Sequence, residues 1–96
     1  MKAARYSFAY SRIGDNIYVV GGGNSTGEGQ LNILKDCEVY DIPKNEWKII
    51  APLPKPLMSP MALSYQNQLF ILGGLTSPST RSKAIYSYQH QTDSWK

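Results

Sequence analysis

An all-β fold built from two repeats of four short strands is predicted by three features of the sequence. Four apolar residues run into a glycine pair at 17–22, and the same pattern recurs at 69–74, 52 residues later. Aromatic residues make up 11% of the 96-residue chain, seven of them tyrosines, a composition that favours strands. Glycines and prolines punctuate short apolar runs that lack helical periodicity. Such a recurrence in so short a chain indicates a repeat architecture.

In the first copy, the strands are expected at 5–11, 17–20, 35–42 and 46–50. Tyr6, Phe8 and Tyr10 fall on one face of the first segment at period two, as strand side chains do. The second segment is apolar on both faces, as expected of a strand buried on both sides. A polar turn at 14–16 joins the two segments, which predicts a hairpin.

In the second copy, the matching strands are expected at 60–65, 69–72, 83–89 and from Ser94 onward. The segments after the glycine pairs, 23–30 and 75–80, are rich in small polar residues and are predicted to be exposed loops. A single helical turn at 30–35 is the alternative for part of the first loop. The prolines of 51–56 predict a connection between the copies. We therefore expect two units, at 4–53 and 54–96.

Composition argues against several classes of function. The net charge is +3, but the ten lysines and arginines are scattered, which favours a solvated surface over a nucleic-acid interface. The N-terminal residues show no secretory signal, and no apolar run is long enough to span a bilayer. We therefore expect a cytoplasmic protein that binds neither nucleic acid nor membrane.

Residues for catalysis, metal or cofactor binding are also lacking in the sequence. The single cysteine, Cys37, matches Ile85 in the second copy, which predicts a small buried apolar side chain. His90, the single histidine, falls in an expected surface turn. Glu28 stands where a phosphate-binding loop needs lysine. The sequence predicts no catalytic residue, no metal ligand and no cofactor.

The order of the repeated residues resembles the kelch repeat. That repeat has an arginine, a strand ending in Gly-Gly, a tyrosine seven residues before a tryptophan, and a proline-rich connection. The matching residues of the first copy are Arg5, Gly21, Gly22, Tyr40 and Trp47. Those of the second copy are Gly73, Gly74, Tyr88 and Trp95, while Leu57 replaces the arginine. The resemblance implies that each copy is one four-stranded antiparallel blade of a β-propeller, and that these glycines and aromatic residues are structural.

The resemblance also implies a partner-binding rim, formed by the loop after Gly-Gly and the connection that enters the first strand. The rim residues carried over in this way are Arg5, Gly23, Asn24 and Ser25 in the first copy, and Leu57, Met58, Ser59, Leu75, Thr76 and Ser77 in the second. Arg5 is the leading single contact, because a guanidinium can bind a carboxylate in bidentate fashion. The alternative is that Arg5 satisfies a backbone carbonyl between blades.

Two blades cannot close a ring, since propellers have four to eight. We therefore expect either a fragment of a longer kelch protein, with the fourth strand of the second blade cut short, or a chain that self-associates to complete the propeller. The function expected is a non-enzymatic protein-interaction module, of the ubiquitin-ligase substrate-receptor or the cytoskeletal-binding type. The alternative is part of a propeller enzyme whose catalytic residues lie in other blades.

Overall fold

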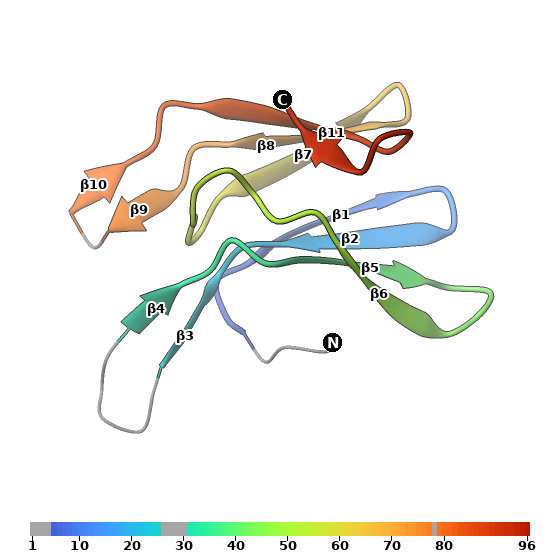
Figure 1. Ribbon diagram of the computed structural model, residues 1–96, viewed down its shortest axis with the longest axis horizontal. Coiled ribbons are helices and arrows are strands. Elements are labelled where there is room, and N and C mark those ends of the chain that lie inside the picture. The colour runs from blue at the N-terminus through green and yellow to red at the C-terminus, as the bar shows by residue number, and fades with distance from the viewer. Residues whose placement is uncertain (1–4, 26–30, 78) are drawn as a thin grey trace.

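The computed structural model of the protein describes residues 5–25, 31–77 and 79–96, which form two four-stranded antiparallel sheets (Figure 1). The first sheet, blade 1, has the strand order β1 (Ala9–Ile13), β2 (Asn16–Val20), β5 (Cys37–Asp41) and β6 (Glu46–Ile50). The second sheet, blade 2, has the equivalent order β7 (Met61–Tyr65), β8 (Gln68–Leu72), β11 (Ile85–Gln89) and β12 (Ser94–Trp95). The predicted all-β fold is confirmed.

Two short ribbons correct the prediction of loops after the glycine pairs. Strand β3 (Gly23–Ser25) pairs with β4 (Leu31–Ile33), and β9 (Leu75–Ser77) pairs with β10 (Thr80–Arg81). Both ribbons extend from the same end of the two sheets, at the left of Figure 1. Backbone pairing builds them, so the side chains carry little strand periodicity. Part of the first expected loop, 26–30, lies outside the described residues, and the alternative of a helical turn is wrong because Leu31–Ile33 is a strand.

The first and third strands of each blade are shorter than predicted. Strand β1 begins at Ala9 and not at residue 5, because Ser7 has φ +52°, a left-handed conformation that interrupts an extended strand. Strands β5 and β11 begin two residues later than expected. The preceding carbonyls, of Asp36 and Ala84, accept hydrogen bonds from the first glycine of each pair instead.

The hydrophobic core lies between the two blades. Strand β1 lies beside β7 (Figure 1). The facing surfaces bring apolar side chains of both sheets together. Val20, Cys37 and Ile71 are fully buried there. The connection between the blades closes the core with Leu53 and Leu57. Each large aliphatic side chain buried in this way contributes about 1.5–3 kcal/mol.

Polar contacts fasten the outer part of the same interface. The indole Nε1 of Trp95 donates to the carbonyl of Ala51 at 2.8 Å, and the Ala51 amide donates to Asp93 Oδ1 at 2.9 Å. Tyr88 also donates to Asp93 Oδ1, at 2.6 Å, while its ring lies 5.1 Å from that of Trp95. Both side chains of the recurring tyrosine and tryptophan pair in blade 2 thus lie at the interface with blade 1. Across the described ranges, no helix is present that could cross a bilayer.

Candidate partner-binding rim

The Gly-Gly ends of the blades bring the expected rim segments together in both repeats. The segment entering blade 1 pairs with β3 through two hydrogen bonds between Tyr6 and Gly23, at 2.9 and 2.8 Å. The segment entering blade 2 pairs with β9 in the same way, through Met58 and Leu75 at 2.9 and 2.8 Å. Each ribbon is therefore extended by a further paired segment, which is the segment that enters the first strand of its blade.

The two halves of the rim are also joined to each other. The Ser59 amide donates to the Ser7 carbonyl at 2.7 Å. These two serines occupy matching positions and share a left-handed backbone, with φ +53° and +52°. The segments entering the two blades consequently form one continuous edge.

The glycine pairs permit this close approach of backbone segments. A Cβ atom on Gly21 would lie 2.5 Å from the Leu57 carbonyl oxygen, and one on Gly22 would lie 2.8 Å from the Tyr6 oxygen. Both glycines also have positive φ, +66° and +99°. The Gly22 amide donates to Leu57 O at 2.8 Å, which ties the glycine pair of blade 1 to the connection that enters blade 2.

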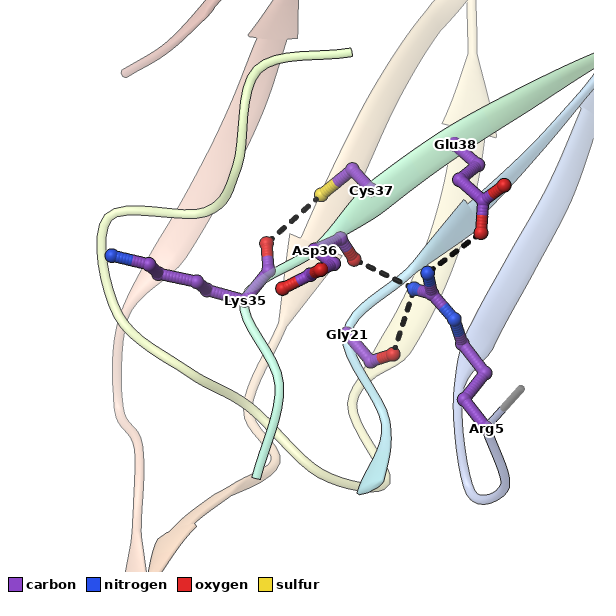
Figure 2. Close-up of polar contacts among 6 residues, drawn as sticks. All are labelled: Arg5, Gly21, Lys35, Asp36, Cys37 and Glu38. Atoms are coloured by element: carbon purple, nitrogen blue, oxygen red, sulfur yellow. Dashed lines mark hydrogen bonds and ion pairs between the residues drawn. The ribbon is translucent and has the colours of Figure 1, made fainter. Parts of the chain in front are cut away.

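Arg5, the leading expected contact, is buried inside blade 1. Its guanidinium donates to the carbonyls of Gly21 at 3.1 Å and Asp36 at 2.7 Å, and pairs with Glu38 Oε2 at 2.7 Å (Figure 2). The Arg5 side chain is 0% exposed and that of Glu38 is 2% exposed. This corrects the expectation that Arg5 reaches a partner. Its side chain instead satisfies carbonyls of its own blade, which is close to the alternative considered from the sequence.

Leu57, the residue that replaces the arginine, is also buried, in the core between the blades. Glu38 escaped the sequence analysis altogether. A paired exchange between the repeats could have identified it. Position 38 matches Tyr86, so the first copy has an arginine and a glutamate where the second copy has a leucine and a tyrosine. A charged pair replaced as a pair indicates contact between the two positions.

Among the rim residues predicted from the sequence, those with exposed side-chain surface carry no charge, while Arg81, at the end of β10 in the second ribbon, is exposed and charged. Ser59 is exposed, while Asn24, Met58, Thr76 and Ser77 are half-buried. Asn24 accepts a hydrogen bond from Asn32 at 3.2 Å across the ribbon, and the Thr76 hydroxyl donates to the Thr80 carbonyl at 3.3 Å. Gly23 is buried, and Ser25 lies at the end of β3. These amides and hydroxyls can hydrogen-bond with a partner, but they cannot act as general acids or bases near neutral pH.

The remaining candidates for chemistry lie elsewhere. Burial raises the pKa of Cys37 to about 12, so the thiol stays protonated, and its Sγ donates to the Lys35 carbonyl at 3.4 Å (Figure 2). His90 is exposed, with its ring 5.9 Å from that of Tyr88. Among the described residues, no group of three or more histidine, cysteine or acidic side chains is placed to hold a metal ion.

Residues 4–54, more than half of the chain, match the Kelch motif. The chain belongs to the kelch-repeat family. Its backbone also superposes on the solved structure of YjhT with a TM-score of 0.81 at 16% identity, over 96% of this chain and 37% of that one. The two sheets are therefore kelch blades of the β-propeller type.

Named kelch proteins match almost the whole chain. Kelch repeat and BTB domain-containing protein 12 of Danio rerio is 30% identical over 95% of the chain, which covers 16% of that relative. An F-box/kelch-repeat protein of Arabidopsis thaliana is 32% identical over 99% of the chain and 24% of its own length. Beta-scruin of Limulus polyphemus is 27% identical over 99% of the chain and 11% of its own length. The chain thus spans between about a tenth and a quarter of these relatives.

Proposed function

We propose that the chain is a non-enzymatic, cytoplasmic protein-interaction module that uses the rim to bind a protein or peptide. The observation that carries the proposal is the continuous edge described above: two ribbons, each paired with the segment entering its blade, joined through Ser7 and Ser59. Its exposed amides and hydroxyls suit a partner with its own hydrogen-bonding groups. Arg5 and Leu57 support the rim from inside and do not contact the partner.

The kelch relatives support a protein partner, and two finer types follow from the family resemblance. One is the substrate receptor of a ubiquitin ligase, and the other is a cytoskeletal binder. The names of two relatives pair kelch repeats with a BTB or an F-box domain, which favours the receptor type. A companion domain beside these blades in the full reading frame would decide between the two types.

We also propose that further blades, or further copies of this chain, cover the outward faces. Blade 1 exposes Tyr10 and Ile49 on the face away from blade 2, and blade 2 exposes Met61, Leu63 and Ile85 on its own far face. Several exposed apolar side chains on one face of a sheet are typical of a contact surface. Sedimentation of the 96-residue chain at micromolar concentration tests this: we expect oligomers, and a cooperatively folding monomer would contradict it.

Site-specific photo-crosslinking tests the rim itself. A crosslinking residue is placed at Ser59 or Thr76, and in a matched control at Gln66, an exposed position in the turn between β7 and β8, at the opposite end of blade 2. We expect protein adducts that repeat between preparations from the rim positions, at least about tenfold more than from the control, because a bound partner excludes water only there. Equal adducts at both ends, or more at Gln66, would refute the rim.

A further inference from the structure

The face of blade 1 that packs against blade 2 changes from apolar to polar along its length. At the Gly-Gly end, Val20, Cys37 and Ile50 are register partners across three strands, and all are buried. At the opposite end, Asn16 pairs with Asp41, and Asp41 pairs with Glu46, on the same three strands. Because alternate residues share a face, this polar row also points toward blade 2.

A cavity of about 370 Å³ lies between the blades at this polar end. Blade 1 supplies the polar row and Tyr18, with Val39 and Ile50 as the apolar wall. Tyr88 and His90 of blade 2 line the opposite side. The volume falls within the range of ligand sites, and both walls belong to this chain, so the cavity does not depend on any further blade.

Tyr18 contributes a hydroxyl to the lining of the cavity. The residue is only 5% exposed, and its ring packs 5.8 Å from that of Tyr88. Its hydroxyl makes no hydrogen bond with any residue that the structure describes, although the side chain lines the cavity. Burial raises the pKa of Tyr18, so the phenol is neutral and its oxygen remains available as an acceptor. Among the described residues, the buried side-chain atom without a partner is Arg5 Nε, so the Tyr18 hydroxyl reaches the open space of the cavity, where water or a ligand can hydrogen-bond to it.

The two carboxylates of the polar row form no ion pair with a described residue, although two lysines line the same cavity. Asp41 and Glu46 are direct cross-strand partners on one face, an arrangement that is unfavourable for like charges. Within the described residues, neither forms an ion pair, since the Arg5–Glu38 pair is the only one there. Asp41 accepts a hydrogen bond from the Lys44 amide at 3.3 Å, which leaves its other oxygen and both oxygens of Glu46 for a ligand.

We propose that this inter-blade cavity binds the guanidinium group of an arginine side chain presented by a protein partner. A guanidinium has five donors and no acceptor, and the polar groups around it, Asn16, Tyr18 and the two carboxylates, can all accept. The aliphatic stem would lie against Val39 and Ile50, as long cationic side chains do on apolar surface.

Two lysines also line the cavity, Lys44 and Lys48, and they oppose a cation. Both are exposed, and Lys48 lies close enough to Asp93 of blade 2 to help lower the pKa of that carboxyl. With Asp41 and Glu46, they bring the formal charge of the lining to zero. Recognition must therefore come from short-range hydrogen bonds, which favours the planar guanidinium over an ammonium group. The cavity lies at the end of the blades opposite the rim, so failure of one site leaves the other testable.

The test is an NMR titration of the 96-residue chain with the blocked tripeptide Gly-Arg-Gly, following the ring signals of Tyr18. The same tripeptide with citrulline is the matched control, because it keeps the shape and removes the charge. We expect the arginine peptide to bind at least tenfold more tightly than the citrulline peptide, and several-fold more tightly than Gly-Lys-Gly. Equal affinity for arginine and citrulline, or no binding to the folded chain at millimolar concentration, would overturn the proposal.

Variants separate this site from an anion site. Asp41→Asn with Glu46→Gln should weaken the arginine peptide at least tenfold, and the single Glu46→Gln variant, at an exposed position, serves if the double variant misfolds. Tyr18→Phe should weaken it several-fold. Lys48→Ala should tighten it two- to fivefold, because an opposing charge is removed. Weaker binding of the arginine peptide by Lys48→Ala would overturn this assignment of charges in the cavity, and a shift of the Tyr18 ring signals by inorganic phosphate instead of the arginine peptide would show that the cavity prefers anions.

Discussion

Blade 1 and blade 2 carry the same repeat, but matching residues differ sharply in burial. Cys37 is fully buried, whereas its counterpart Ile85 is 63% exposed. Ala9 is 4% exposed, and its counterpart Met61 is 66% exposed. In each case the buried residue faces the other blade and the exposed one faces away from it. The core of this protein is therefore a property of the contact between blades and not of a single blade.

The two blades also hold the segment that enters the first strand in different ways, by a polar solution in blade 1 and an apolar solution in blade 2. In blade 1, the position that precedes the first strand is an arginine bound to Glu38 and to two carbonyls. In blade 2, Leu57 and Tyr86 occupy the matching positions and pack into the core. The polar solution has a cost, because the buried Arg5 Nε has no hydrogen-bond partner among the described residues. Both solutions fix the entering segment against its blade.

The largest expected effect comes from removing one partner of the buried Arg5–Glu38 ion pair, the polar solution of blade 1. Arg5→Leu removes the guanidinium that faces Glu38 and its hydrogen bonds to the Gly21 and Asp36 carbonyls, of which Asp36 keeps the Gly21 amide as a donor. Removal of one partner from a buried ion pair costs about 3–5 kcal/mol, so we expect a loss of that order in the free energy of unfolding. Urea denaturation followed by circular dichroism measures it.

The matched control converts blade 1 fully to the apolar solution. In Arg5→Leu/Glu38→Tyr, both charges are replaced by the pair that blade 2 already uses. Because apolar replacement of a whole buried ion pair is often nearly neutral, we expect at least about half of the single-variant loss to be recovered. A double variant as unstable as Arg5→Leu alone would show that the two blades are not equivalent at this place.

The next effect contrasts the first glycines of the two pairs. A Cβ on Gly21 would lie 2.5 Å from the Leu57 oxygen, while one on Gly73 would meet nothing within 4 Å. Both have φ +66°, so alanine at either position carries the cost of a left-handed conformation, about 1–2 kcal/mol. We expect Gly21→Ala to cost about 1–3 kcal/mol more than Gly73→Ala, since overpacking is added. Equal losses in thermal unfolding would contradict the contact with Leu57.

A smaller difference separates the two tryptophans. Trp95 donates to the Ala51 carbonyl across the blade interface, whereas the Trp47 indole makes no hydrogen bond with a described residue. Both rings pack on their own tyrosine at similar distances, 5.1 and 5.0 Å. Trp95→Phe should therefore destabilise the chain by about 0.5–1.5 kcal/mol more than Trp47→Phe, the value of one hydrogen bond. The reverse order in urea denaturation would contradict this assignment.

The repeat made the fold predictable from the sequence, and the same repeat explains what was missed. Recurrence of Gly-Gly and of the tyrosine and tryptophan spacing was enough to predict two four-stranded sheets, because those residues serve local turns and packing. The ribbons β3–β4 and β9–β10 were missed because backbone hydrogen bonds hold them, and such bonds leave no side-chain pattern.

The candidate sites were less predictable, because they depend on which groups meet across the fold. The sequence predicted that Arg5 contacts a partner, yet Glu38, 33 positions away, binds the Arg5 guanidinium inside blade 1. The cavity near Tyr18 is lined by residues of both blades, so no local sequence motif could predict it. Comparison of the two copies position by position would have paired Arg5 with Glu38, and this is the signal that the repeat offers.

The smallest expected effect is a pH dependence that only blade 2 has. Asp93 accepts hydrogen bonds from Tyr88 and from the Ala51 amide, and these lower the pKa of its carboxyl below the ordinary value of 3.8. In blade 1 the matching residue is Asn45, which accepts from Tyr40 and does not titrate. A carboxyl whose pKa is lower in the folded state stabilises the fold above its unfolded pKa, and this stability is lost as the pH falls through the folded value.

Asp93→Asn should therefore lower the melting temperature slightly at pH 7, where the charge-assisted bonds are lost. The difference in melting temperature from the unsubstituted chain should shrink below about pH 4. All other carboxyls are common to both proteins, so the difference isolates Asp93. A gap that stays constant from pH 7 to pH 2 would mean that these hydrogen bonds do not depend on the charge of Asp93, and that Asp93 and Asn45 serve their blades in the same way.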